Sequence, residues 1–204
     1  MGHAHEHGAH ATAHEGPLWW ALGLTGTFLL VEIAGGLLTN SLALLSDAAH
    51  MATDTAGLVI ALAAVRLSRR PPDARRTFGF ARVEALGALA NGVLLMGVAG
   101  YILWEAAERF RDPPAVAATG MLVVAVAGLI VNLVAMRILA RGSSESLNVK
   151  GAYLEVWSDM LGSLGVLITA VAIRMTGWLI LDPILAVLIG LWVLPRTWSL
   201  LHEA

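Results

Sequence analysis

Long apolar stretches recur along this chain, and they constrain its fold more than any other feature of the sequence. Each is close to the roughly 20 residues that an α-helix needs to cross about 30 Å of hydrocarbon. A soluble domain would not repeat such stretches, and 57% of the 204 residues are hydrophobic while only 14% are charged. The predicted spans are Leu18–Leu38, Ser41–Val65, Ala81–Trp104, Ala115–Leu139, Gly151–Ile173 and Trp178–Leu194.

These spans are expected to be helices rather than strands. An open sheet edge would leave backbone groups unpaired in lipid, and a closed barrel would show short alternating segments instead. The sequence therefore predicts an all-α membrane protein, a multi-pass bundle of six transmembrane helices. Pro183 suits the first turn of the sixth helix, where its missing N–H costs nothing. Ser143, Ser144 and Glu145 are candidate caps for a fifth helix that begins before the membrane.

The distribution of basic residues predicts the orientation of the bundle. Cytoplasmic loops carry an excess of lysine and arginine. One side of the predicted bundle collects ten of the 13 basic residues, and the other side collects only Arg109, Arg111 and Arg174. Both termini are therefore expected in the cytoplasm. The ten are Arg66, Arg69, Arg70, Arg75, Arg76, Arg82, Arg137, Arg141, Lys150 and Arg196.

The first 17 residues are expected to form a histidine-rich cytoplasmic tail, separate from a transmembrane domain over residues 18–204. The tail has no basic start and no apolar core of a signal peptide. Imidazole binds Zn, Cu, Ni and Co, so the tail is a candidate for weak metal capture. The alternative is a solvated segment without a role. Its histidines are His3, His5, His7, His10 and His14.

Composition also excludes several classes of function. The chain has no cysteine, so disulfides, thiolate metal sites and thiol redox motifs are excluded. A net charge of −2 without a basic face makes nucleic acid an unexpected partner. No His-Glu-x-x-His motif occurs, and no enzyme activity or resident cofactor is expected.

Two pairs of ionisable residues fall inside the predicted spans and mark a candidate metal site. His50 and Asp54 are four residues apart, as are Glu155 and Asp159, so each pair lies on one helix face with side chains about 5–6 Å apart. Ionisable groups in a bilayer cost several kcal/mol and usually face water, a partner charge or a transported ion. Facing each other, the pairs would supply one imidazole and three carboxylates to a tetrahedral site.

Other interpretations of these residues stay open. His50 and Asp54 are alternatively a structural hydrogen-bonded pair between helices, although serine or asparagine would do this at lower desolvation cost. Glu155 is alternatively an interfacial, solvated residue. Asp47 is a candidate outer ligand, orienting partner for the imidazole or proton acceptor on the access path.

Further polar residues inside the spans are of types that commonly form hydrogen bonds between membrane helices. Glu32, Glu84, Asn91 and Asn132 are each more often interhelical hydrogen-bonding groups than metal ligands. Glu32 and Asn91 are the candidates for lining a hydrated access path.

Several of these segments resemble the cation diffusion facilitator family. The resemblance runs from about Leu18 to the C-terminus and rests on four motifs that fix residue types and spacing together. They are Ser41-Leu-Ala-Leu-Leu-Ser-Asp-Ala-Ala-His-Met-Ala-Thr-Asp54, Arg82-Val-Glu-Ala-Leu-Gly-Ala-Leu-Ala-Asn-Gly92, Asn148-Val-Lys-Gly-Ala-Tyr-Leu-Glu-Val-Trp-Ser-Asp-Met-Leu-Gly-Ser163 and Leu181-Asp-Pro183. The resemblance implies a homodimeric six-helix exporter of zinc or other divalent metals that exchanges metal for protons.

This sequence departs from the family pattern in two ways. Glu155 stands where the family usually has histidine, and an oxygen-rich ligand set could admit Co²⁺, Cd²⁺, Mn²⁺ or Fe²⁺ beside Zn²⁺. The usual cytoplasmic C-terminal domain is also missing, through a naturally short chain or a truncation. A homodimer would then have to form through membrane helices.

The ligand set suggests how metal and protons would be coupled. Three carboxylates around one imidazole repel one another when no metal is bound, so some are expected to hold protons, which a divalent ion replaces. Alternating exposure of such a site makes a metal/proton antiporter, expected in a bacterial inner membrane. The alternative function is a membrane sensor or storage protein that binds metal without transporting it.

Overall fold

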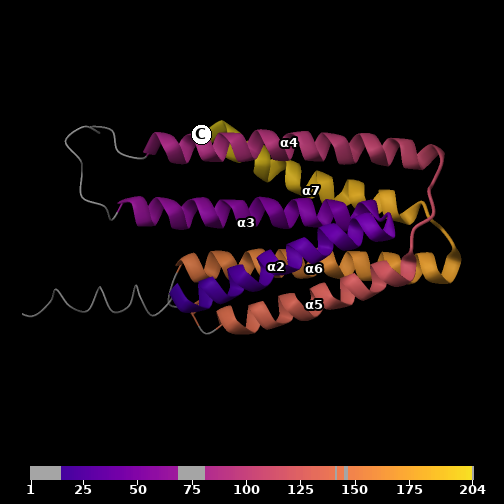
Figure 1. Ribbon diagram of the computed structural model, residues 1–204, viewed down its shortest axis with the longest axis horizontal. Coiled ribbons are helices and arrows are strands. Elements are labelled where there is room, and N and C mark those ends of the chain that lie inside the picture. The colour runs from indigo at the N-terminus through magenta and orange to yellow at the C-terminus, as the bar shows by residue number, and fades with distance from the viewer. Residues whose placement is uncertain (1–14, 69–80, 141, 145–146, 204) are drawn as a thin grey trace, which may run out of the picture.

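The structure is a computed structural model that describes residues 15–68, 81–140, 142–144 and 147–203. These residues form six α-helices (Figure 1). Their bounds are α2 (Glu15–Thr39), α3 (Leu42–Ser68), α4 (Ala81–Arg111), α5 (Ala118–Ala140), α6 (Leu147–Thr176) and α7 (Leu181–Glu203). The histidines predicted to form the metal-binding tail lie outside the described residues.

The helices confirm the predicted all-α class, with some corrections to their bounds. Helix α6 begins at Leu147, before the predicted start at Gly151. Ser143 does not cap α6, because it lies four residues before Leu147 and its hydroxyl donates to the carbonyl of Ala140 at the end of α5 (2.9 Å). Glu145, another predicted cap, lies outside the described residues. Pro183 does lie in the first turn of α7, where a missing N–H leaves no helical hydrogen bond unmade.

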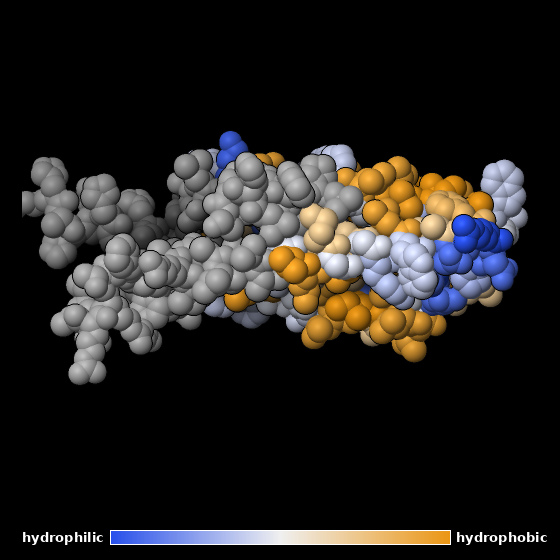
Figure 2. All heavy atoms as spheres, turned by 90° about the horizontal axis from the view of Figure 1, so that it is seen from above, coloured by the Kyte–Doolittle hydropathy of each residue, from blue (hydrophilic) through white to orange (hydrophobic). Residues whose placement is uncertain are grey.

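Three of the described helices have the length and composition of membrane spans. Among the described residues, Leu18–Thr39, Ala118–Ala140 and Val149–Thr176 are each long and apolar enough to cross a bilayer, and Leu181–Trp192 is a shorter apolar helix. Large hydrophobic side chains such as Leu38 (85% exposed) point outward. Figure 2 shows hydrophobic side chains over much of the described lateral surface. The chain is thus an integral membrane protein.

Successive helices run up and down the long axis of the bundle (Figure 1). One end holds Glu15 and Glu203, and we call it the terminal end. The opposite end holds the short α2–α3, α4–α5 and α6–α7 connections, and we call it the turn end. Helix α3 contacts α2, α4, α6 and α7, so its polar residues face the interior from the centre of the bundle.

Glycines let α2 pack closely against α5. A β carbon on Gly128 would lie 2.7 Å from the ring of Phe28 and 2.9 Å from the hydroxyl of Ser163, and one on Gly35 would lie 2.7 Å from Val124. Small residues at such contacts allow membrane helices to approach closely. This packing places α2 and α5 beside the part of α6 that carries Asp159.

Candidate metal centre

The predicted ligand pairs come from two helices that face each other across the interior. His50 and Asp54 lie one turn apart on α3, and Glu155 and Asp159 lie one turn apart on α6. His50, Asp54 and Asp159 are buried, with exposed fractions of 4%, 8% and 5%. Helical spacing alone aligns each pair, and the α3–α6 contact brings the pairs together.

Three of the four predicted ligands form a compact group. The Nε2 atom of His50 lies 3.8 Å from Oδ2 of Asp54 and 3.8 Å from Oδ1 of Asp159. One ligand atom from each residue lies within 4.8 Å of the others. Zinc bonds of about 2.0–2.2 Å in tetrahedral geometry separate ligand atoms by roughly 3.3 Å. Small side-chain rotations would therefore bring all three atoms to bonding distance of one ion.

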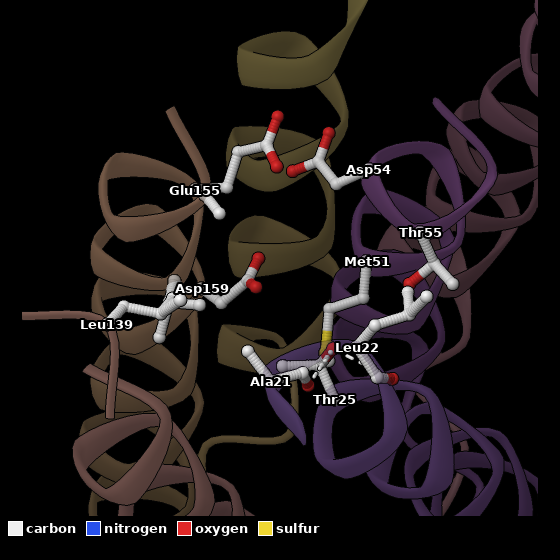
Figure 3. Close-up of a pocket in the computed structure, with 11 residues that line it drawn as sticks. Ala21, Leu22, Thr25, Met51, Asp54, Thr55, Leu139, Glu155 and Asp159 are labelled. Carbon is white, nitrogen blue, oxygen red and sulfur yellow. Dashed lines mark hydrogen bonds between the residues drawn. The ribbon is translucent and has the colours of Figure 1, made fainter. Parts of the chain in front are cut away.

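Glu155 lies beside this group but is not one of its three members. It is half-buried and lines the same pocket as Asp54 and Asp159. In Figure 3 its carboxylate points toward that of Asp54. Glu155 lies one turn before Asp159 on α6 and is therefore closer to the terminal end. Glu155 therefore takes a position on the terminal side of the metal group, from which its longer side chain can reach an ion.

The pocket lies on the terminal side of the metal group. The N-terminal half of α2 and the N-terminal half of α6 line the pocket (Figure 3). Helix α5 contributes its second-last residue. All three segments lie toward the terminal end of the bundle. The lining residues are Ala21, Leu22, Thr25, Met51, Asp54, Thr55, Leu139, Ala152, Glu155, Val156 and Asp159.

A serine that the sequence did not single out also reaches the imidazole. The hydroxyl of Ser158 on α6 lies 3.3 Å from Nε2 of His50. Because Nε2 is also the atom that faces Asp54 and Asp159, the serine competes with them for one lone pair or one proton. The signal in the sequence was only its place beside Asp159, which did not distinguish it from a packing residue.

Two more acidic residues lie on the turn side of the metal group. Asp47 on α3 is fully buried, and a β carbon on Gly162 of α6 would collide with its carboxylate. Glu32 on α2 is 1% exposed and is close enough to Asp47 and Asp159 to interact with both electrostatically. A role for Asp47 and Glu32 on the access path stays a prediction. The side chain of Asn91 lies outside the described residues.

Asn132 has the ordinary role predicted for it. It is fully buried on α5, and its side-chain amide donates to the hydroxyl of Ser163 on α6 (3.3 Å). This interhelical hydrogen bond ties α5 to α6 one turn beyond Asp159.

The charge of the site suits a divalent cation. Asp54, Glu155 and Asp159 carry three negative charges when deprotonated, beside a neutral His50. Such a concentration of charge away from water is strongly unfavourable unless cations offset it. A bound divalent ion offsets two of the three charges, and both oxygen and imidazole ligands suit zinc.

Comparison with known proteins gives one family over nearly the whole chain. The model of the cation efflux transmembrane domain matches residues 18–204. The chain is 60% identical over 203 residues to the metal cation efflux system protein CzcD of Cupriavidus metallidurans, covering 100% of this chain and 63% of that protein. It is 46% identical to the zinc transporter ZitB of Escherichia coli, covering 100% of this chain and 66% of that protein.

A third relative has a name that specifies its exchange reaction. The cadmium, cobalt and zinc/H(+)-K(+) antiporter of Bacillus subtilis is 43% identical over 206 residues, which cover 100% of this chain and 65% of that protein. The chain thus spans slightly less than two thirds of the length of these curated relatives.

Proposed function

This chain belongs to the cation efflux family, and on that premise we propose that it exports divalent metal cations, Zn²⁺ foremost, in exchange for protons. The observation that carries the proposal is the buried group of His50, Asp54 and Asp159, whose ligand atoms lie within 4.8 Å of one another. The names of relatives from three bacteria, which include metal cation efflux, zinc transport and an antiporter, support the same function in a bacterial inner membrane.

The coupling follows from competition for one site. Metal ligation requires neutral imidazole and ionised carboxylates, so a bound ion and the protons of the empty site exclude each other. Metal enters from the terminal end, on the side where the pocket lies, and protons enter when the site faces the other side. Both termini are then cytoplasmic, as the basic residues predict.

Metal preference depends on Glu155 in this proposal. With Glu155 as the fourth ligand, the site has one nitrogen and three oxygen donors, which bind Zn²⁺ and also accept harder ions such as Mn²⁺. Co²⁺, Cd²⁺ and Fe²⁺ are further candidates. Transport rather than catalysis is the activity that the family supports.

Two further parts of the proposal concern regions beyond the site. The histidine-rich tail would capture metal in the cytoplasm and raise its concentration near the pocket. The working unit would be a homodimer that forms through membrane helices.

The test is metal flux into proteoliposomes that contain the purified full chain. We expect Asp159→Asn and Asp54→Asn to abolish Zn²⁺ flux, because each removes a charged ligand of the buried group. Asp112→Asn is the matched control, since Asp112 is exposed at the end of α4 and flux should persist. A pH gradient should drive flux in the parent chain.

The outcomes separate transport from the alternative of sensing or storage. Parental flux in both site variants would refute the assignment of the site. Tight binding of Zn²⁺ by the parent without any flux would instead identify a sensor or storage protein.

A further inference from the structure

A polar network with a buried centre occupies the turn end of the bundle, on the other side of the metal group from the pocket. Its centre is Asp182, which is fully buried at the start of α7. Oδ1 of Asp182 accepts hydrogen bonds from the Ser41 hydroxyl (2.6 Å) and the Ala43 backbone N–H (3.2 Å), and Oδ2 accepts one from the Leu42 N–H (2.7 Å). The first N–H groups of a helix have no partner within it, so α7 supplies the cap of α3.

Arg109 joins this network from the last turn of α4. Its guanidinium is buried, and Nη1 lies 3.6 Å from Oδ2 of Asp182. Nη1 donates to the backbone carbonyl of Asn40 (2.7 Å), Nη2 donates to Oδ1 of Asn40 (3.0 Å), and Nε donates to Glu105 (2.9 Å). All three nitrogens of the guanidinium therefore have partners, and two of them hold one residue, Asn40.

Asn40 forms the turn between α2 and α3. Its φ of 57° lies in the left-handed region, where asparagine is tolerated better than most residues. Its side-chain amide donates to the carbonyl of Ala115 in the α4–α5 connection (3.2 Å). Through Asn40, Arg109 and Asp182, the α2–α3 turn is tied to α4, to the α4–α5 connection and to α7.

The two ends of the bundle therefore differ. The pocket lies on the terminal side of the metal group, whereas at the turn end charge-assisted hydrogen bonds join the buried Arg109 and Asp182 to their neighbours. Transport requires the site to be exposed to each side in turn, so this end must open during the cycle.

We propose that the network of Asn40, Arg109 and Asp182 is a latch that keeps the turn end closed and must release Asn40 before the metal site opens there. This inference rests on the proposed transport function. When Arg109 releases Asn40, neither charged group loses all its partners. Asp182 still accepts its hydrogen bonds from α3, and Arg109 still pairs with Glu105, which is a quarter exposed to solvent. The latch can therefore open without stranding a buried charge, which would be strongly unfavourable.

The absence of cysteine makes accessibility labelling a clean test. Ser46→Cys places a thiol on α3 between the network and Asp47, where Ser46 is 1% exposed and its hydroxyl donates to the Ala186 carbonyl (2.9 Å). Thr25→Cys places a thiol in the pocket on the terminal side. Each single-cysteine full chain, in proteoliposomes of known orientation, is treated with a membrane-impermeant maleimide from each side.

We expect Arg109→Met to raise the labelling rate of Ser46→Cys from the turn side at least about tenfold. The variant removes both hydrogen bonds to Asn40, and the loss of even one charge-assisted hydrogen bond shifts an equilibrium by about that factor. Labelling of Thr25→Cys from the terminal side should fall. Arg111→Met is the matched control, because Arg111 lies in the same turn of α4, is exposed, and pairs only with exposed Glu108 among the described residues (3.1 Å).

A second variant keeps the test valid if Arg109→Met does not fold. Asn40→Gly removes the side chain that Arg109 binds, while glycine keeps the left-handed turn without strain. It should also speed labelling of Ser46→Cys from the turn side. Equal labelling of Ser46→Cys in Asn40→Gly, Arg111→Met and the parent would overturn the latch. Labelling does not require flux, so absence of Zn²⁺ flux in the parent would refute the proposed function separately.

Discussion

At the scale of single residues, the site is defined by what surrounds Nε2 of His50. This atom lies 3.8 Å from a carboxylate oxygen of Asp54, 3.8 Å from one of Asp159 and 3.3 Å from the Ser158 hydroxyl. A metal bound to Nε2 would therefore lie close to two carboxylates. Glu155 differs from Asp54 and Asp159, because it is half-buried and lines the pocket one turn closer to the terminal end than Asp159. We infer that Glu155 selects among ions more than it holds them.

The variant Glu155→His tests this role of Glu155. An imidazole is a softer ligand than a carboxylate and favours Zn²⁺ over Mn²⁺. We therefore expect the ratio of Zn²⁺ flux to Mn²⁺ flux in proteoliposomes to rise severalfold. Glu108→His, on an exposed site, is the control and should leave the ratio unchanged. An identical metal profile in Glu155→His and the parent would show that Glu155 does not set selectivity.

At the scale of elements, the helices of this bundle bury polar residues beside an apolar core and expose many large apolar side chains. Glu32, Asp47, Asn132 and Asp182 are among the largest fully buried side chains of the described residues. In lipid, burying apolar groups between helices gains no hydrophobic free energy, so close packing at glycines contributes much of the free energy of helix association. Helix α2 is held against α5 in this way at Gly128, next to the α6 residue Ser163.

The variant Gly128→Ala should destabilise the bundle. The added β carbon would lie 2.7 Å from the Phe28 ring and 2.9 Å from the Ser163 hydroxyl, so both must shift. Overpacking of this kind typically costs about 1–3 kcal/mol. Gly100→Ala is the control, because nothing lies within 4 Å of its added carbon. Thermal unfolding in detergent should show a lower midpoint for Gly128→Ala alone; equal midpoints would contradict the close packing.

At the scale of the whole molecule, a pocket on the terminal side and a closed network at the turn end would together define one state of the proposed transport cycle. The metal group lies between them, on α3 and α6, which contact each other and both contact α7. A ligand that binds both helices at once should stabilise the bundle as a unit.

Zinc should therefore raise the unfolding midpoint of the purified chain. Binding at 100 times the dissociation constant adds about 2.7 kcal/mol to the stability of the folded state. We expect this gain to persist when residues 1–17 are deleted and to vanish in Asp54→Asn, as measured by thermal unfolding with and without Zn²⁺. Loss of the gain on tail deletion alone would place the stabilising site in the tail rather than in the bundle.

The amino-acid sequence by itself determined the helical class and the pairing of candidate ligands within each helix. Hydrophobic length and four-residue spacing are local properties, and they predicted six helices, the alignment of His50 with Asp54, and that of Glu155 with Asp159. The family motifs added the expected function, which the comparisons support.

Only the tertiary structure decided which residues from different helices meet. Asp159 joins His50 and Asp54, while Glu155 stands one turn away toward the terminal end, and Ser158 reaches the same imidazole. The network of Asn40, Arg109 and Asp182 joins residues up to 141 positions apart when Ser41 is included. Spacing along a helix fixes direction within that helix alone, whereas the rotation and depth of one helix against another follow from packing over the whole bundle.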